Sequence, residues 1–354
     1  STVTQGPAVI PASIDEVTPQ WLTDALGREV SAVAADRIAE DSGFASFLYR
    51  VHLTGASDLP ETVIVKLPGT PEARGAMEML GGYRRELEFY RRVAGRAPMA
   101  APRVHVAEIG ASAAEFVLVM EDLAGWTNAD HLAGLSMEQA RLAIAGLAGL
   151  HAWSVDPANA IPTDVFPNLD SPAAREVFLP VFELAWPVYL EHAGVPVPPS
   201  VAEFAERFTD YAAQALDVLG NRRMLLHGDI RADNLFFSGD AMKVVDFQFT
   251  CYGAGAADVA YLVSQGLPSD VRRGHDRELL REYLAELARH GVTDYSCDAA
   301  WRDYRMATAY LIVLPVITLM GWDAMPDRSR KLCLELTRRA VATIDEIDAL
   351  EAFA

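Results

Sequence analysis

The sequence contains few cysteines and no pattern that joins them. Only three occur among its 354 residues, Cys251, Cys297 and Cys333, and no two of them have C-x-x-C spacing. This argues against a disulfide framework and against a cysteine-based zinc site. A chain of this length can bury a large apolar core without crosslinks. We therefore expect a protein of a reducing compartment, and specifically of the cytoplasm.

The sequence also lacks the usual features of exported and membrane-spanning chains. Residues 1–16 have neither the basic nor the apolar segment of a secretory signal. The most apolar stretch, residues 306–322, is shorter than the roughly 20 residues that span a bilayer. It also contains Pro315. We therefore expect no membrane partner, and we predict a buried core helix with a kink at this proline.

Positive charge is scarce relative to negative charge. The chain has 30 Lys and Arg against 49 Asp and Glu, which gives a formal net charge of −19. Nucleic acids and anionic membranes select basic surfaces, so this balance argues against both as partners. A cationic small molecule stays open as a partner, although a well-solvated acidic surface is the more ordinary explanation.

The sequence pattern changes near residue 123, from segments typical of strands to segments typical of helices. Before it, four short runs rich in β-branched and aromatic residues predict strands of one antiparallel sheet at 46–55, 62–68, 103–110 and 115–123. Between the second and third of these strands, apolar residues at helical spacing predict one helix over 81–95.

After this point helical periodicity dominates. Ser136 and Gln139 have capping-box spacing at the start of an Ala- and Leu-rich segment. Further helices are predicted at 176–192, 201–219, 277–290, 299–314 and 328–350. Short strands interrupt the helices at 224–249. The sequence therefore predicts an α+β fold with a small β-rich lobe, residues 1–123, and a larger, mainly helical lobe, residues 124–354.

The segment LLHGDIRADNLFF, residues 225–237, places several polar residues between two apolar runs. Asp229 and Asn234 are five positions apart, and Asp246 follows a turn, in VVDF. Strand pairing across that turn can bring Asn234 and Asp246 together. A carboxylate and an amide oxygen are ligands that Mg²⁺ prefers. Asp229 could then orient a substrate hydroxyl and accept its proton during phosphoryl transfer.

HGDIRADN followed by VVDF resembles the catalytic loop and metal-binding Asp of the aminoglycoside phosphotransferase and choline kinase superfamily. These are small-molecule kinases with a bilobal protein-kinase-like fold. VVDFQFTCYGAGAADVAYLV is most similar to the ecdysteroid-kinase-like and related bacterial phosphotransferases. The resemblance extends over roughly residues 41–263. It implies Mg²⁺ as cofactor and ATP or GTP as co-substrate.

The resemblance implies a role for each matching residue of the helical lobe. Asp229 matches the catalytic Asp, and Asn234 and Asp246 match the two metal ligands. His227 is expected to brace the catalytic loop through backbone hydrogen bonds, because such a histidine does this more often than it transfers protons. Asp258 resembles the supporting acid beneath that loop. Each of these residues alone could equally stabilise a turn, but the ordered set favours a kinase.

In the β-rich lobe the resemblance implies an ion pair and a phosphate contact. Lys66 in VIVKL matches the strand lysine that contacts the α and β phosphates. Glu86 in YRRELEFY matches its helix partner, and Glu78 and Glu88 are rival partners.

The segment LVMEDLAG resembles the link between the lobes of these kinases. The backbone of Glu121 and Leu123 would hydrogen-bond the purine, and Met120 would line its pocket. The Gly-rich phosphate lid of protein kinases is absent, because DSGFASFLYR contains only Gly43. Ser46 and neighbouring backbone N–H groups would have to replace the lid.

Other polar and aromatic residues have ordinary structural interpretations. Arg231 and Asp233 could touch substrate, but a surface ion pair is the simpler explanation. His151 lies on an apolar helix, which is typical of a core histidine. Four aromatic residues at helical spacing could line an acceptor pocket, although such a stripe is usually packing: Phe178, Phe182, Trp186 and Tyr189.

Two departures separate the chain from protein kinases. Gly228 stands at the Arg position of H-R-D, and Gln248 at the Gly position of D-F-G. The short spacing from Asp246 to Asp258 leaves little room for a peptide-docking segment. The sequence therefore predicts a phosphotransferase that moves the γ-phosphate of ATP or GTP to a hydroxyl group of a small molecule.

The acceptor and the oligomeric state are left open. An antibiotic, which would make the protein a resistance enzyme, a sugar, a choline-like amine, a nucleoside or a steroid would each fit. A nucleotide-binding regulator without catalysis is the alternative from another class, and a protein kinase is a further one. Retention of Lys66, Asp229, Asn234 and Asp246 argues against the regulator, because a binder need not keep a base.

Overall fold

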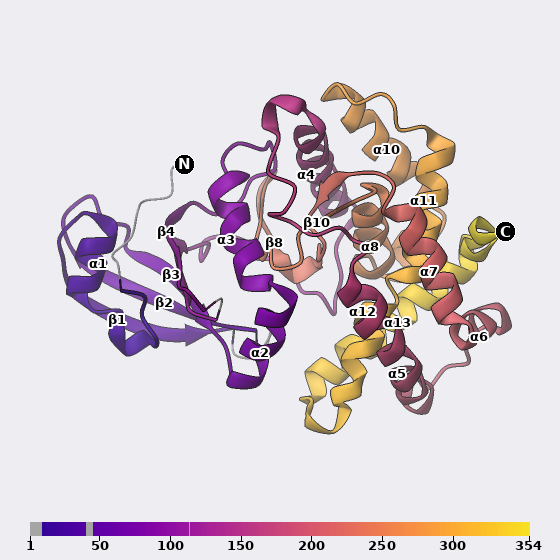
Figure 1. Cartoon of the computed structure of the whole chain (residues 1–354), viewed down its shortest axis with the longest axis horizontal. Helices are drawn as coiled ribbons and strands as arrows, with labels where there is room; N and C mark the ends of the chain where they lie inside the picture. Colours follow the sequence, from indigo (N-terminus) through magenta and orange to yellow (C-terminus); the bar gives the residue numbers. More distant parts are fainter. Residues whose placement is uncertain (1–8, 40–44, 113) are drawn as a thin grey trace. The chain divides into compact units, whose positions relative to one another are not determined.

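The structure is a computed structural model and describes residues 9–39, 45–112 and 114–354. Its internal contacts divide the chain into two compact units (Figure 1). Unit 1 contains the chain up to Trp126 together with Lys243–Phe249, and unit 2 contains Thr127–Met242 and Thr250–Ala354. The functional lobes predicted from the sequence, 1–123 and 124–354, stay a prediction.

Unit 1 is built on a five-stranded antiparallel sheet with the strand order β1-β2-β3-β5-β4. Its strands are β1 (Val30–Ile38), β2 (Ser46–Gly55), β3 (Thr62–Pro68), β4 (Val104–Ile109) and β5 (Phe116–Glu121). Its helices are the 3-10 turn η1 (Ile14–Glu16), α1 (Pro19–Leu26), α2 (Pro71–Leu80) and α3 (Gly82–Arg92).

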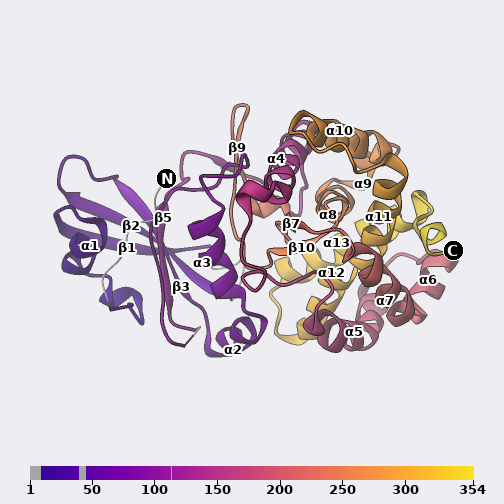
Figure 2. The same ribbon diagram turned by 45° about the horizontal axis from the view of Figure 1, so that its top comes forward.

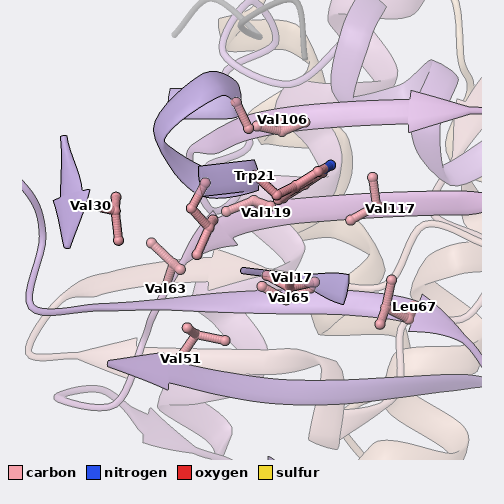
Figure 3. Close-up of a cluster of buried hydrophobic side chains, with 12 residues drawn as sticks. Val17, Trp21, Val30, Val51, Val63, Val65, Leu67, Val106, Val117 and Val119 are labelled. Atoms are coloured by element: carbon pink, nitrogen blue, oxygen red, sulfur yellow. The ribbon is translucent and has the colours of Figure 1, made fainter. Parts of the chain in front are cut away.

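One face of this sheet is covered by α1. Trp21 of α1 lies among valines of the central strands, and Figure 3 shows this buried cluster. Val63, Val65 and Leu67 of β3 belong to it. Because side chains alternate along a strand, Lys66 projects from the opposite face of β3. This alternation is how an otherwise apolar strand presents a charged amine away from the valine cluster.

Unit 2 is mainly helical. Its longer helices are α4 (Met137–Val155), α5 (Leu179–His192), α6 (Pro199–Glu206), α7 (Phe208–Leu219), α8 (Ala256–Gly266), α10 (Asp276–Arg289), α11 (Cys297–Tyr310) and α13 (Asp327–Glu346). The short helices α9 (Ser269–Arg272) and α12 (Val313–Thr318) and the turns η2 (Pro157–Asn159), η3 (Ala174–Phe178), η5 (Leu319–Ala324) and η6 (Ala349–Phe353) connect or extend them. In Figure 2, α8 lies among α4, α11 and α13, which all contact it.

Short strands of unit 2 carry the polar loop singled out in the sequence. β7 (Met224–Leu226) pairs with β10 (Cys251–Gly253). β6 (Thr127–Asn128) pairs with β8 (Leu235–Ser238), which follows the 3-10 turn η4 (Ala232–Asn234). Within β9 (Ala241–Val244) the chain passes from unit 2 into unit 1.

The apolar stretch near residue 310 is divided between several elements. Among the described residues, Cys297–Ala324 is the one helical stretch long and apolar enough to cross a membrane by length and composition, and 61% of its most apolar window is buried inside the protein. The core helix of a protein outside a membrane passes the same test. The predicted kinked helix is a succession of α11, α12 and η5, with Pro315 inside α12.

Candidate functional site

The amine of Lys66 joins three elements of unit 1. Its Nζ lies 2.6 Å from Oε1 of Glu86 on α3 and 4.0 Å from Oδ1 of Asp246. Lys66 is 6% exposed and Glu86 is 1% exposed. Burial lowers the pKa of Lys66, but the two carboxylates raise it more, so that its pKa lies above the usual value. The amine therefore keeps its positive charge in a buried position.

Of the three glutamates considered as helix partners, Glu86 is the one beside the β3 lysine. Glu88 instead accepts a hydrogen bond from Nε of Arg92 at 2.5 Å. Glu78 is within 3.5 Å of the Ser112 hydroxyl, which donates to it. Glu86 lies on the buried side of α3, about one helical turn from the buried residues Tyr83 and Tyr90.

The loop that holds Asp246 is anchored on α3. The backbone N–H of Phe247 donates to Oε2 of Glu86 at 2.9 Å. The Phe247 ring stacks on Phe89 with 3.7 Å between ring centroids and meets Tyr90 edge-on. Asp246 itself has φ +65°, a left-handed conformation that is unusual for a non-glycine residue and marks functional loops.

The carboxylate of Asp246 has an oxygen that accepts no hydrogen bond. Its Oδ1 is buried, has no hydrogen-bond partner among the residues that the structure describes, and lies 4.0 Å from the Lys66 amine. A buried carboxylate oxygen is usually hydrogen-bonded, so one that is not calls for an explanation such as a bound ion. No cluster of three or more His, Cys, Asp or Glu side chains suited to a metal occurs in the described parts of the chain.

Ser46, proposed from the sequence for phosphate contact, is held by the same loop. The Gln248 side chain, 3% exposed, donates to the Ser46 hydroxyl at 3.1 Å. Gln248 stands out in the sequence as a departure from D-F-G, but its contact with Ser46 was not predicted. Gly43, the single glycine of the segment, lies outside the described residues.

The segment after β5 contains a backbone donor, at Leu123, that makes no hydrogen bond to the described residues. Met120 is buried, and the Glu121 N–H donates to the Arg103 carbonyl at 2.8 Å. The Glu121 carboxylate accepts from Lys243 Nζ at 2.8 Å. The N–H of Leu123, a buried residue, has no hydrogen bond to any part of the chain that is described. It is thus available to an acceptor such as a purine ring nitrogen.

In unit 2, β7 leads directly into the polar loop. The N–H of Asp229 donates to Nδ1 of His227 at 3.1 Å. The Asn234 side-chain amide donates to the Asp229 carbonyl at 2.9 Å, so the side-chain oxygen is not used in this contact. Tyr261 of α8 donates its hydroxyl to Oδ1 of Asp229 at 3.2 Å. The structure therefore brings Asp229 and Asn234 together and adds Tyr261.

Asp258 fixes the backbone of this loop through hydrogen bonds. Its carboxylate accepts the backbone N–H groups of His227 at 2.8 Å and of Gly228 at 3.1 Å. It also lies 2.8 Å from Nε2 of His151, whose Nδ1 is 2.7 Å from the Tyr283 hydroxyl. His151 is a buried, hydrogen-bonded histidine, as predicted. Its place beneath the loop could not be predicted, because α4 and α8 are far apart in the sequence.

Arg231 and Asp233 form a partly buried bidentate pair. Arg231 Nε and Nη2 donate to the two Asp233 oxygens at 3.0 and 2.5 Å. Next to the pair is His131, a residue that the sequence did not single out. It is 3% exposed, and neither ring nitrogen has a hydrogen-bond partner among the described residues. Burial lowers its pKa to about 3.

Three residues of the aromatic stripe are core residues. Phe182 is fully buried and stacks on Phe208 with 3.8 Å between centroids. Trp186 and Tyr189 pack against each other and are also buried. None of these three side chains is exposed enough to offer a surface to an acceptor molecule, and packing is the correct interpretation.

Comparison with known proteins gives one family and a large group of similar folds. The model of the ecdysteroid kinase-like family matches residues 40–292. A search of curated proteins finds no match to this chain.

Among solved structures, a candidate aminoglycoside phosphotransferase from Ralstonia eutropha JMP134 is 12% identical, with 95% of this chain and 98% of that chain covered and a TM-score of 0.58. Choline kinase from Cryptosporidium parvum Iowa II is 11% identical, with 94% of each chain covered and a TM-score of 0.57. The protein APH(2")-IIIa, solved as a complex with GDP and kanamycin, is 14% identical, with 89% and 94% covered and a TM-score of 0.52. These likenesses establish the kinase-like α+β fold, as predicted.

Proposed function

The chain belongs to the ecdysteroid kinase-like family, and from that premise we propose that it transfers the γ-phosphate of ATP or GTP to a hydroxyl group of a small molecule. The structures with the same fold include small-molecule phosphotransferases. The observation that carries the proposal is the meeting of Lys66, Glu86 and Asp246 in unit 1, from β3, α3 and the segment after β9.

Unit 1 supplies the nucleotide half of the proposed reaction. The Lys66 amine, held by Glu86, offers a positive charge to the α and β phosphates. The free N–H of Leu123 offers a donor to the purine, with the carbonyl of Glu121 as acceptor and Met120 lining the pocket. Ser46, fixed by Gln248, offers a hydroxyl to the phosphates. Similar folds bind GDP in one solved complex, which agrees with a nucleotide co-substrate but leaves ATP and GTP as alternatives.

Magnesium fits the residues that the resemblance assigns to it. The buried Oδ1 of Asp246, which accepts no hydrogen bond from the described residues, and the amide oxygen of Asn234 are hard oxygen donors of the kind Mg²⁺ takes. The ion would neutralise charge on the β and γ phosphates when bound. We propose these two residues as its protein ligands.

Unit 2 supplies the acceptor half of the proposed reaction. The acceptor oxygen attacks the γ-phosphorus, its proton passes to the carboxylate of Asp229, and the nucleoside diphosphate leaves. Tyr261 and the Asn234 amide hold Asp229, and His227 and Asp258 hold the loop backbone. A hydroxylated antibiotic or metabolite, cationic or neutral, is the proposed class of acceptor, and a cytoplasmic location stays a prediction.

The substitution Asp229→Asn tests the proposal. It removes proton acceptance but little nucleotide contact, so turnover should fall by about 10²–10⁴, while ATP or GTP still binds. A screen of γ-phosphate consumption over hydroxylated metabolites and antibiotics would first identify the acceptor. The matched control is Asp240→Asn, at the exposed turn before β9, which should leave turnover unchanged.

The same experiment separates the alternatives. A nucleotide-binding regulator would show no turnover in the wild-type protein and no functional effect of Asp229→Asn. Phosphorylation of protein substrates alone in the screen would favour a protein kinase.

A further inference from the structure

Three arginines line a cavity of unit 2 that the proposed reaction does not use. The cavity has a volume of about 550 Å³ and lies where the turn after α7 meets the loop between α10 and α11. Arg222 and Arg223 reach it from the turn, and Arg302 reaches it from α11. We call it the arginine pocket. Its concentration of guanidinium groups contrasts with the net charge of −19 of the whole chain.

The arginine pocket is at the opposite end of β7 from the proposed base. Arg222 and Arg223 precede the strand, whereas Asp229 follows it, and neither Asp229 nor Asn234 lines the pocket. A molecule bound here is therefore not an acceptor in position for phosphoryl transfer. Binding at the arginine pocket does not require that the protein transfer phosphate.

Two of the three guanidinium groups are held in place without being neutralised. Arg222 lies over the ring of Tyr295, with its Cζ 3.9 Å from the ring centroid, and no carboxylate of the described residues pairs with it. Arg223 lies over the Tyr252 ring at 3.8 Å and donates to the Asn168 side chain at 2.9 Å. Stacking on an aromatic ring orients a guanidinium and leaves its N–H groups available.

The acidic groups of the pocket balance these charges only in part. Arg302 is 3.7 Å from Asp303, its neighbour in the chain. Asp303 already accepts the Tyr295 hydroxyl at 2.6 Å, and burial raises its pKa above the usual value. Asp294, the other acid of the lining, is exposed. Three permanent positive charges thus face at most two negative ones.

We propose that the arginine pocket binds a phosphorylated small molecule, with its phosphate group held by the guanidinium groups that line the pocket, those of Arg222, Arg223 and Arg302. Guanidinium groups bind phosphate through paired hydrogen bonds, and a phosphate monoester carries the double negative charge that unneutralised arginines favour. The cavity is in the size range of ligand sites and has room for the organic part of such an ester.

Binding of glycerol 3-phosphate to the full chain tests the proposal. The protein is first saturated with MgADP, so that the nucleotide site cannot take the probe, and binding is followed by calorimetry. We expect one site, no binding of glycerol, and about tenfold weaker binding or more in Arg222→Gln and in Arg302→Gln, since each loses charge-assisted hydrogen bonds. A parallel titration with inorganic phosphate shows whether the organic part of the ester contributes to binding. If inorganic phosphate and glycerol 3-phosphate bind with equal affinity, the site recognises the phosphate group alone.

The controls keep this result separate from the proposed function. Arg207→Gln removes another exposed arginine over a tyrosine ring, Tyr211, and should bind like the wild type. Arg302 is 53% exposed, so its substitution tests the site even if Arg222→Gln fails to fold. Lys66→Met should impair transfer and leave the probe bound. The proposal would be overturned if glycerol 3-phosphate showed no saturable site, or if both Arg222→Gln and Arg302→Gln bound it as tightly as the wild type. Loss of glycerol 3-phosphate binding in Lys66→Met would also overturn it.

Discussion

Tyr261 allows the proposed base to be tested without replacing it. Its hydroxyl donates to Asp229 at 3.2 Å, and a donated hydrogen bond stabilises the ionised form of a carboxylate. In Tyr261→Phe the pKa of Asp229 should therefore rise, and the acid limb of the pH profile of kcat should move to higher pH. We expect turnover to fall by roughly threefold to tenfold at neutral pH, within the range of a single hydrogen bond.

The control is Tyr189→Phe, which removes a hydroxyl from another buried tyrosine of unit 2. It should leave the pH profile unchanged. A Tyr261→Phe variant with lower turnover but an unshifted profile would indicate a packing effect and no influence on Asp229.

The burial of His131 leads us to expect that the folded protein loses stability in weak acid. Burial lowers its pKa from about 6.5 to about 3 in the folded protein, whereas the unfolded chain binds a proton near pH 6.5. Between these values the unfolded state holds more protons, so the free energy of unfolding falls as the pH falls. From pH 7.5 to pH 5 this histidine alone should remove about 2 kcal/mol of stability.

Urea unfolding of the wild type and of His131→Leu at both pH values measures this effect. The variant should lose about 2 kcal/mol less than the wild type over this interval. Parallel losses in the two proteins would mean that His131 can be protonated in the folded state.

At the scale of the elements, the sequence predicted strands rich in β-branched and aromatic residues and helices with a clear helical period. β2 and β3 have their predicted bounds. The Ser136–Gln139 capping box forms with both of its hydrogen bonds. α8 was not predicted because every residue in it is buried, so its pattern has no helical period. The predicted helix 201–219 ends and restarts at Arg207, and no proline or glycine signals that break.

β1, α1 and α2 were also missed, each for a local reason. β1 lies at the edge of the sheet and is mostly exposed, so that its residues show no alternation. α1 and α2 are short, and both begin with a proline after a threonine, Thr18 and Thr70, whose side chain caps the helix. That pairing is a recognisable start signal, and it could have been used.

The candidate site was predictable where its residues are local in sequence. The spacing within HGDIRADN identified Asp229 and Asn234, and the residues of VIVKL and YRRELEFY identified Lys66 and Glu86 through a resemblance. The contacts of Tyr261 and Gln248 join elements that are distant in the chain, and no spacing rule describes them. These contacts can be recognised only in the folded structure.

Arg339 holds α13 to the rest of unit 2. It is 3% exposed and donates to the carbonyls of His131, Gln265 and Leu132 at 3.1, 2.9 and 2.6 Å. Arg339→Met would leave three carbonyls, two of them in buried residues, without their charged donor, at a cost of about 3 kcal/mol in the free energy of unfolding. Urea unfolding measures it. Arg328→Met, on the same helix at a side chain that is 61% exposed, should cost less than about 1 kcal/mol. If the two substitutions lowered the free energy of unfolding equally, Arg339 would not hold α13 in this way.

At the scale of the whole molecule, the charge of the chain opposes its proposed co-substrate. A protein of −19 repels a nucleoside triphosphate over distances of about 10 Å at moderate salt. The attraction must therefore come from local groups, namely Lys66 and a bound cation. Buried charges are screened less than surface charges, so the Lys66 amine can act despite the surrounding acidic surface.

Removal of divalent metal should consequently abolish transfer and weaken nucleotide binding. Without Mg²⁺ the phosphates keep their full negative charge against an acidic protein, and Asp246 adds to the repulsion. We expect no transfer in EDTA, recovery with excess Mg²⁺, and a higher Mg²⁺ requirement in Asp246→Asn than in the control Asp240→Asn. ADP binding, measured by calorimetry with and without Mg²⁺, gives a readout apart from activity. Transfer that continues in EDTA would contradict the proposed role of Asp246 as a metal ligand.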